Sequence, residues 1–207
     1  MMNLQSRNEL SGTFNDPQVL TQLATDEEES VRVEVAHNPN TPPRVLAWLA
    51  NEYEWVVRAN VAANPNTPAE VLAQLANDED EYVRVAVAEN VHTPAEVLTR
   101  LANDEDWDVR MEVARNPSLP SEVFVELAND NHEGVRANVA GNINTPAGVL
   151  AQLATDEDAQ VRGMARETLI SLPTEKLLSV LVERGGNRSD FADLPDSWLV
   201  EAIIPKD

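Results

Sequence analysis

Apolar residues recur along this chain in short clusters with helical spacing. In the stretch 64–89, Val71, Leu72, Leu75 and Ala76 fall at positions i, i+1, i+4 and i+5, which form one face of a helix. A second cluster with the same kind of spacing begins at Val83, after an Asn-Asp interruption. No segment alternates apolar and polar residues as a half-buried strand would. The pattern predicts an all-α protein that alternates a first helix of about nine residues with a second helix.

This two-helix pattern repeats every 26 residues. A Val-Arg pair marks each second helix without insertion or deletion, and its arginines are Arg32, Arg58, Arg84, Arg110, Arg136 and Arg162. A fixed period of this length is typical of stacked small units, because one such unit cannot bury its apolar face alone. The sequence therefore predicts one elongated domain, an α-solenoid. Its six repeats cover 12–37, 38–63, 64–89, 90–115, 116–141 and 142–167.

The two ends of the chain depart from the repeat. Residues 1–11 match no repeat, and we expect a frayed tail or a short amino-terminal cap there. Repeat 6 ends in Ala165 and Arg166 where the earlier repeats have Val-Ala, and helix starts led by Pro173 and Pro195 follow. The last repeat of an array must have its exposed core face covered. We therefore expect residues 168–207 to form a helical carboxy-terminal cap.

Thr, Pro and Asn residues predict where the helices begin and end. Thr67 can cap the first helix of repeat 3 by accepting a backbone N–H, and Pro68 fits its first helical position. An asparagine opens each later repeat: Asn38, Asn64, Asn90, Asn116 and Asn142. Asparagine tolerates the left-handed conformation that often closes a helix, and a following proline disfavours helical geometry. It persists where Val91 or Ile143 replaces the proline, so we expect it to act on its own through backbone hydrogen bonds.

An acidic residue stands six positions before each arginine of the Val-Arg pairs. It is Glu52 in repeat 2 and an aspartate elsewhere: Asp26, Asp78, Asp104, Asp130 and Asp156. A row of arginines could bind anions. The planar guanidinium also suits an internal ladder, in which each arginine bonds the acidic residue and turn carbonyls between stacked repeats. The recurrence of acid and base in every repeat favours the ladder, and thus a structural role.

The charge balance excludes several classes of function. The chain has 36 acidic and 15 basic residues, a net charge of −21 and a sequence pI near 4.3. Direct binding of nucleic acid or of an anionic membrane needs clusters of Lys and Arg, which are missing. The absence of cysteine excludes disulfides and cysteine-held zinc or iron–sulfur centres. No apolar run resembles a signal or membrane segment, so a cytoplasmic location is the default expectation.

Acidic turns precede four of the second helices, at 26–29, 78–81, 104–106 and 156–158. Since stacked helices lie about 8–10 Å apart, these turns should form a negative ridge. The ridge is either a solubilising edge or a docking edge for a basic partner. Asp104, Asp106 and Asp108 match the first half of a calcium-binding EF-hand loop. Val109 and Arg115 stand where that loop needs Gly and Glu, so we expect no metal site.

Four aromatic residues stand in columns of the repeat that are otherwise mostly polar. Trp48 replaces Gln, Arg or Glu. Trp55 and Trp107 share a column that is otherwise Glu or Ala, and Tyr82 occupies the next column. Polar columns should face solvent, and Trp and Tyr are common anchors of interfaces. These rings predict a partner-binding surface, with sealing of the neighbouring turns as the alternative.

The sequence contains no convergent catalytic group. His37, His92 and His132 occupy three different positions in the repeat, so they do not converge as metal ligands or as a general base. No Gly-rich phosphate loop and no Ser or Cys nucleophile motif is present. We therefore expect no enzymatic activity and no cofactor.

The segment NPNTPAEVLAQLA followed by DEDEYVRVAVA resembles the leucine-rich repeat variant family. The resemblance covers about residues 12–167 and implies short helices, some of them 3₁₀ in character, stacked in a right-handed superhelix. The Asp-then-Val-Arg portion also resembles HEAT-type repeats, including those of phycobilin lyase proteins. An iron–sulfur cluster is associated with the first-described family member, but this chain has no cysteine to hold one.

The residues and the resemblance together predict a non-enzymatic scaffold that binds a protein or peptide partner. The acidic turns would steer that partner if it is basic. One alternative is an acidic DNA mimic that occupies a nucleic-acid-binding protein. A more remote one is an accessory HEAT-like lyase or chaperone component. The identity of the partner and the oligomeric state stay open.

Overall fold

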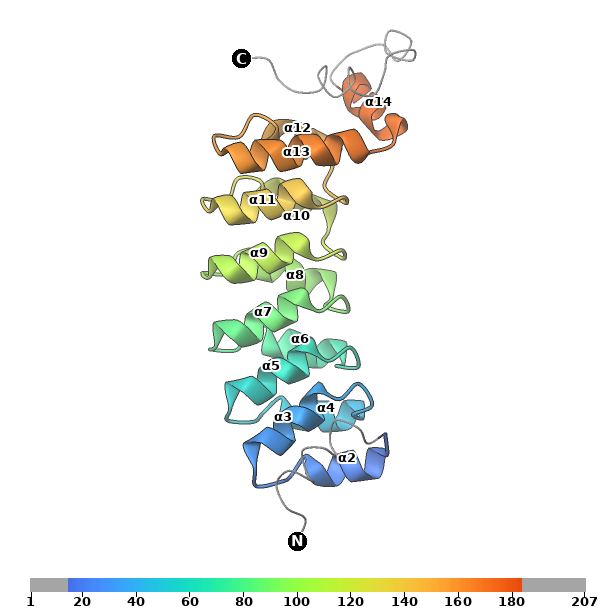
Figure 1. Cartoon of the computed structure of the whole chain (residues 1–207), viewed down its shortest axis with the longest axis vertical. Coiled ribbons are helices and arrows are strands. Elements are labelled where there is room, and N and C mark those ends of the chain that lie inside the picture. The colour runs from blue at the N-terminus through green and yellow to red at the C-terminus, as the bar shows by residue number, and fades with distance from the viewer. Residues whose placement is uncertain (1–14, 184–207) are drawn as a thin grey trace. The chain divides into compact units, whose positions relative to one another are not determined.

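The computed structural model describes residues 15–183, which form thirteen α-helices and no strand (Figure 1). The predicted all-α solenoid is therefore confirmed. The predicted tail at 1–11, and residues 184–207 of the predicted cap with the helix start at Pro195, lie outside the described residues. The chain divides into two compact units, one ending at Val109 and one beginning at Arg110.

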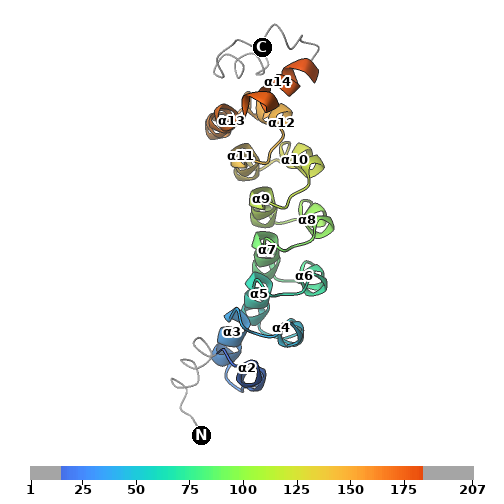
Figure 2. The same ribbon diagram turned by 90° about the vertical axis from the view of Figure 1, so that its right-hand side faces the viewer.

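The N-terminal unit consists of two layers of helices (Figure 2). One layer holds the first helices of the repeats: α2 (Pro17–Leu23), α4 (Pro43–Leu49), α6 (Ala69–Leu75) and α8 (Ala95–Leu101). The other holds the second helices: α3 (Glu29–His37), α5 (Trp55–Ala63) and α7 (Glu81–Glu89), and in it α5 packs against both α3 and α7. The helix α9 (Trp107–Arg115) spans the boundary between the two compact units.

The C-terminal unit continues the alternation. Its helices are α10 (Ser121–Leu127), α11 (Glu133–Gly141), α12 (Ala147–Leu153), α13 (Ala159–Ser171) and α14 (Thr174–Glu183). Here α11 packs against α13, and α12 packs against α13 and α14. Within residues 15–183, no helix is long and apolar enough to cross a bilayer.

The core consists of the apolar faces that the sequence predicts. Leu72 and Leu75 of α6 and Val83 and Val87 of α7 are all at most 2% exposed. Burying such a side chain stabilises a fold by about 1.5–3 kcal/mol. Because each repeat buries its face against its neighbours, the core runs through the stack of helices in each unit.

The first helices are shorter than predicted. They have seven residues instead of about nine, because both ends of the predicted span are caps. Pro68 precedes α6 in extended conformation, with ψ of 147°, and Ala76 follows it as the C-cap. The next two N–H groups, of Asn77 and Asp78, bond carbonyls three residues back, which tightens the last turn.

The predicted role of the repeat threonine as an N-cap is wrong. The hydroxyl of Thr67 donates to the carbonyl of Val61 in the preceding helix, and Thr93 does the same to Val87 at 2.6 Å. These buried hydroxyls satisfy carbonyls at the ends of the second helices. The threonine therefore stabilises the end of one helix rather than the start of the next.

The expected left-handed closure at asparagine is also wrong. Asn64 and Asn90 end α5 and α7 in extended conformation, with φ near −70° and −68°. The helix α7 ends in the same column as α5, although Val91 stands where repeat 3 has Pro65. The asparagine therefore ends the helix without help from proline.

Repeat 6 has a longer second helix. The helix α13 has 13 residues instead of nine, because it continues past Glu167, the position at which the other second helices end. Thr168 stands where the other repeats have the closing asparagine, and no proline follows before Pro173. The boundaries of the six repeats and of the cap stay predictions.

Candidate docking surface

Arginines of the Val-Arg pairs join a turn of their own repeat to an acidic side chain of the next repeat. Arg58 donates from Nη1 to the carbonyls of Glu52 and Tyr53, at 2.9 and 2.6 Å. Its Nε and Nη2 donate to the two carboxylate oxygens of Asp78, at 2.6 and 2.8 Å. The carboxylate partner is thus the acid twenty residues later, while the acid six residues earlier contributes its carbonyl.

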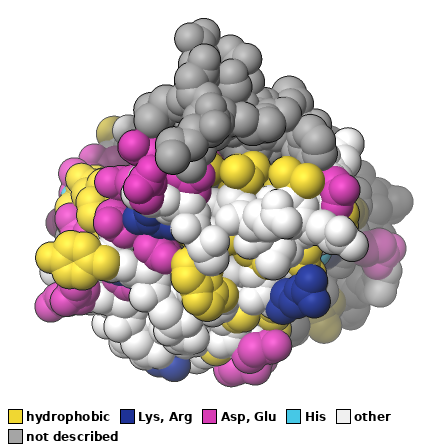
Figure 3. All heavy atoms as spheres, turned by 90° about the horizontal axis from the view of Figure 1, so that it is seen from below, with side chains coloured by type: hydrophobic (Ala, Val, Ile, Leu, Met, Phe, Trp, Pro, Cys, Tyr) yellow, Lys and Arg dark blue, Asp and Glu magenta, His cyan; other side chains and the backbone are white. Residues whose placement is uncertain are grey.

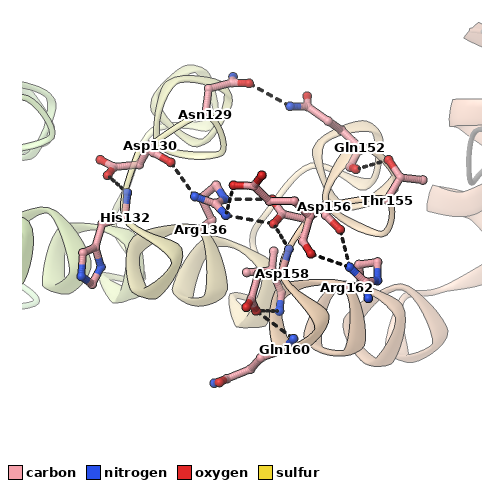
Figure 4. Close-up of polar contacts among 12 residues, drawn as sticks. Asn129, Asp130, His132, Arg136, Gln152, Thr155, Asp156, Asp158, Gln160 and Arg162 are labelled. Carbon is pink, nitrogen blue, oxygen red and sulfur yellow. Dashed lines mark hydrogen bonds and ion pairs between the residues drawn. The ribbon is translucent and has the colours of Figure 1, made fainter.

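The same arrangement recurs within both compact units. Arg84 binds Asp104 at 2.8 Å and Arg110 binds Asp130 at 2.6 Å. Figure 4 shows Arg136 between the turn of Asp130 and the carboxylate of Asp156, with Nε to Oδ2 at 2.8 Å. These arginine–aspartate pairs form the ladder.

The two ends of the ladder differ from its middle. Arg32 bonds Glu52 and Glu54, at 3.2 and 3.1 Å, instead of a single aspartate, and it also bonds the carbonyl of Asp26. Arg162 donates to the carbonyls of Asp156 and Glu157, but twenty residues later the chain has Val182 in place of an acid. The segment after repeat 6 thus lacks the acidic residue that would continue the ladder.

The ladder lowers the pKa values of three of its aspartates. Burial is the largest single influence on the pKa of Asp78, and it raises that pKa. Hydrogen bonds from Arg58 and from the N–H of Asp80 lower it, and together the lowering influences outweigh burial, so the pKa lies below its ordinary value. The pKa values of Asp130 and Asp156 are lowered in the same way by Arg110 and Arg136. These aspartates are therefore held in their charged form.

The asparagines form a second connection between repeats. Asn64 is 2% exposed and donates from Nδ2 to the carbonyls of Ala36 and Asn38, at 2.7 and 2.9 Å. Its Oδ1 accepts from the N–H of Asn66 at 2.9 Å. Asn90 and Asn142 likewise donate to carbonyls of the preceding repeat. The Oδ1 atoms of Asn38, Asn90, Asn116 and Asn142 each accept the N–H two residues later, as that of Asn64 does.

All four aromatic residues singled out in the sequence lie in the N-terminal unit and are exposed. The exposed fractions are 48% for Trp48, 44% for Trp55, 58% for Tyr82 and 40% for Trp107. The rings of Trp55 on α5 and Tyr82 on α7 contact each other, with centroids 5.2 Å apart and planes tilted by 32°. Trp48 lies on α4, in the other layer, beside a hollow lined by Thr21, Arg44 and Val45.

A hollow of about 380 Å³ borders Trp55. It is lined by Glu29 at the start of α3, by Glu79 and Asp80 in the turn before α7, and by residues of α5 and the turn before it: Tyr53, Glu54, Trp55, Val56 and Arg58. Acidic and hydrophobic side chains also lie next to one another in the view of Figure 3, at its left. We call the hollow that borders Trp55 the Trp55 hollow.

Sequence reasoning overlooked Tyr53, which lines the Trp55 hollow and is 93% exposed. The signal was present, because its column holds Glu27, Glu79, Glu105, Asn131 and Glu157 in the other repeats. An aromatic residue in a polar column was the criterion that found Trp55. Applied to every column, it would have found Tyr53 as well.

The described residues contain no candidate metal centre. Within 15–183, no group of three or more His, Asp or Glu side chains is placed to hold an ion. His132 caps α11 by accepting the N–H of Gly134 at 3.2 Å.

Comparison with known proteins agrees with this repeat architecture. A family model described as leucine rich repeat variant matches residues 55–80, 83–106 and 133–158. These are leucine-rich repeat variant units. The first and third of the units begin where α5 and α11 begin, so the family motif spans a second helix and the following first helix.

Two solved structures show the same fold, and a third has a lower score. A structure described as a leucine-rich repeat variant with a novel repetitive protein structural motif has 26% identity and a TM-score of 0.60, over 90% of this chain and 80% of its own. YibA of Escherichia coli has 18% identity and a TM-score of 0.52, over 88% and 80%. An archaeal HEAT-like repeat protein from Thermococcus onnurineus NA1 has 14% identity and a TM-score of 0.38, over 99% of each chain. Comparison with curated proteins gave no match.

Proposed function

We propose that this chain is a non-enzymatic scaffold that binds a protein or peptide partner through the aromatic surface, defined as Trp55, Tyr82 and Trp107. The observation that carries the proposal is the contact between Trp55 and Tyr82, whose rings are 5.2 Å apart while both stay exposed. Preformed, rigid aromatic rings lose little entropy on binding and are frequent energetic centres of interfaces. Trp48 is a candidate for a separate contact.

The repeat itself supports an outward role for these rings. Glu29, Glu81 and Glu133 occupy the column of Trp55 and Trp107, so the stack forms there without an aromatic residue. Rings that merely sealed the stack would be expected to be buried, yet they are 40–58% exposed. The arrangement favours rings that contact a partner.

An acidic DNA mimic, the alternative, needs exposed carboxylates at regular spacing. The most regular set in this chain belongs to the ladder, and its side chains are only 8–9% exposed: Asp78, Asp104, Asp130 and Asp156. Each of them is bonded to an arginine. The scaffold proposal therefore has more support.

The test is capture of partners from the native lysate by the wild-type chain and by the double variant W55A/W107A. Ala159 stands in the same column, so alanine is compatible with the stack. A partner whose capture is lost by the variant supports the proposal. Captured partners that bind both proteins equally would remove the aromatic surface from consideration.

Three controls accompany this comparison. Circular dichroism and thermal unfolding establish that the double variant is folded. V125A removes a 52% exposed apolar side chain from a column that is Ala47 and Ala73 elsewhere, and it should not change capture. W48Q, which installs the residue of Gln22 and Gln74, decides whether Trp48 belongs to the interface.

A further inference from the structure

We infer that the Trp55 hollow is a receptor site for an arginine side chain of the partner. The inference rests on the proposed function, because it names the chemistry that a partner of the aromatic surface would bring to that surface. It is carried by the two aromatic residues that line the hollow, by its carboxylates and by an equivalent hollow that lacks the aromatic residues.

The two aromatic residues provide faces against which a flat group can stack. Tyr53 and Trp55 both line the hollow, and Tyr53 is almost fully exposed. Contact with Tyr82 supports the ring of Trp55 from the next repeat. A cation over the face of a Trp or Tyr ring is attracted by the negative charge of that face.

The charge of the hollow is negative. Four carboxylates line it, those of Glu29, Glu54, Glu79 and Asp80, against the single guanidinium of Arg58. That guanidinium is already bonded to Asp78 and to two carbonyls, so its charge is compensated within the ladder. Glu54 is engaged by Arg32 and Asp80 caps α7, which leaves Glu29 and Glu79 as the carboxylates best placed for an incoming cation.

Arginine fits this combination better than lysine. Its guanidinium is planar and weakly hydrated, so it can stack on a ring while its edge donates to carboxylates. A lysine ammonium is a compact, strongly hydrated charge that cannot stack in this way. The hollow offers both a ring face and carboxylates, which is the pair of features that a guanidinium uses.

The same hollow occurs in the C-terminal unit without its rings. A space of about 300 Å³ is lined by Asn131, Glu133, Arg136, Glu157 and Asp158. These residues stand three repeats after Tyr53, Trp55, Arg58, Glu79 and Asp80 in register. Asn131 and Glu133 thus replace the two aromatic residues. The repeat supplies the carboxylates and the ladder arginine, while the rings are particular to the Trp55 hollow.

The experiment is a titration of the full chain with a short glycine–serine peptide that carries one central arginine. The readout is the indole N–H signals in a ¹H–¹⁵N spectrum, in which the four tryptophans of the chain give separate probes. We expect a saturable shift of the Trp55 signal, larger than those of Trp48 and Trp107. A peptide with citrulline, the neutral isostere of arginine, should give no such shift, and a lysine peptide should bind more weakly.

Matched variants locate the site. W55A should weaken arginine binding about tenfold, as expected for loss of a cation–π contact and its packing. In that variant, the amide signals around residues 53–58 provide the readout. E79Q should weaken binding, whereas E157Q, in the same column of the ring-free hollow, should leave it unchanged. The double substitution N131Y/E133W should create a second arginine site with its own indole signal.

Three results would overturn the inference: equal shifts with arginine and citrulline, equal weakening by E79Q and E157Q, or no response at Trp55. If Trp55 does not respond while W55A/W107A still loses its lysate partner, the arginine site is wrong and the scaffold proposal stands. If the arginine peptide binds as expected while capture of every partner is unaffected, the scaffold proposal fails on its own.

Discussion

Asn64 illustrates why one residue type recurs at the start of five repeats. Its amide has a donor that reaches two carbonyls of the preceding repeat and an acceptor that takes an N–H of its own turn. No other side chain of similar size combines both functions in this geometry. The residue is buried, so water could not replace Asn64 as the partner of these backbone groups.

We predict that N64A lowers the free energy of unfolding by about 2 kcal/mol, because it leaves buried backbone groups unsatisfied. N64D should cost more at pH 7, since it keeps the acceptor but turns a carboxylate oxygen toward the carbonyls of Ala36 and Asn38. Urea denaturation followed by circular dichroism measures both effects.

The matched control is N66S, because Ser118 occupies the column of the exposed Asn66. The side chain of Asn66 donates to the carbonyl of Pro39 at the surface, where water can replace it, and its backbone N–H, which Asn64 binds, is unchanged. The loss should therefore stay below about 1 kcal/mol. Equal effects of N64A and N66S would contradict the assigned role of Asn64.

At the scale of the elements, the ladder joins second helices to the turn of the next repeat. Arg58 and Asp78 form a two-bond contact between groups that are only 10% and 8% exposed. Breaking a buried pair of this kind leaves an uncompensated charge. The ladder therefore makes the contact between neighbouring repeats depend on the ionisation of the aspartate.

The pKa shifts set the direction of the pH dependence. The folded-state pKa values of Asp78, Asp130 and Asp156 lie below the ordinary value of about 3.9. The unfolded chain therefore binds protons first as the pH falls, which favours unfolding. The stabilisation is present above the unfolded pKa and is lost as the pH falls through the folded pKa.

We predict that the free energy of unfolding falls between pH 5 and pH 3, and that D78N flattens this dependence. D78N should also cost about 3 kcal/mol at pH 7, because Arg58 loses its counter-charge in a buried setting. Urea denaturation at pH 7, 5, 4 and 3 gives both quantities. E79Q, a change at the next residue and outside the ladder, should keep the wild-type slope; parallel profiles of D78N and wild type would contradict the assignment.

The elements were predictable where the signal is periodic. The apolar faces around Leu72 and Val83 identified the helices and their alternation, because side-chain spacing along one chain defines a helical face. The N-cap role of Thr67 and the left-handed conformation of Asn64 were wrong, whereas the backbone hydrogen bonds expected of Asn64 are present. Both side chains bond groups of the preceding helices or repeats. Sequence spacing within one repeat cannot reveal contacts that depend on how the next repeat stacks.

The same limit applies to the candidate site. Trp55 and Tyr82 stood out as aromatic residues in polar columns, but their contact joins two repeats and two different columns. The Trp55 hollow likewise combines residues from Glu29 to Asp80. Its residues become neighbours only through the stacking of three successive repeats.

At the scale of the whole molecule, the dominant property is the net charge of −21. The ladder neutralises buried aspartates one by one, but the exposed acids of the turns have too few basic partners. Mutual repulsion of like charges destabilises a compact state and favours an expanded chain. Dissolved salt screens exposed charges strongly, with a Debye length of about 8 Å at physiological ionic strength, and screens buried pairs much less.

These two facts predict that added salt stabilises the protein at pH 7. The urea midpoint should rise between 20 mM and 500 mM NaCl (about 20 and 3–5 Å of screening length) because repulsion on the surface falls while the ladder persists. Potassium chloride and choline chloride at equal ionic strength should act alike if screening is the cause. A falling midpoint would mean that exposed ion pairs dominate, and a rise with sodium alone would indicate a bound cation. The same salt series on D78N separates repulsion between exposed charges from attraction within the ladder. The variant lacks one ladder pair, so its urea midpoint should rise with salt at least as much as that of the wild type.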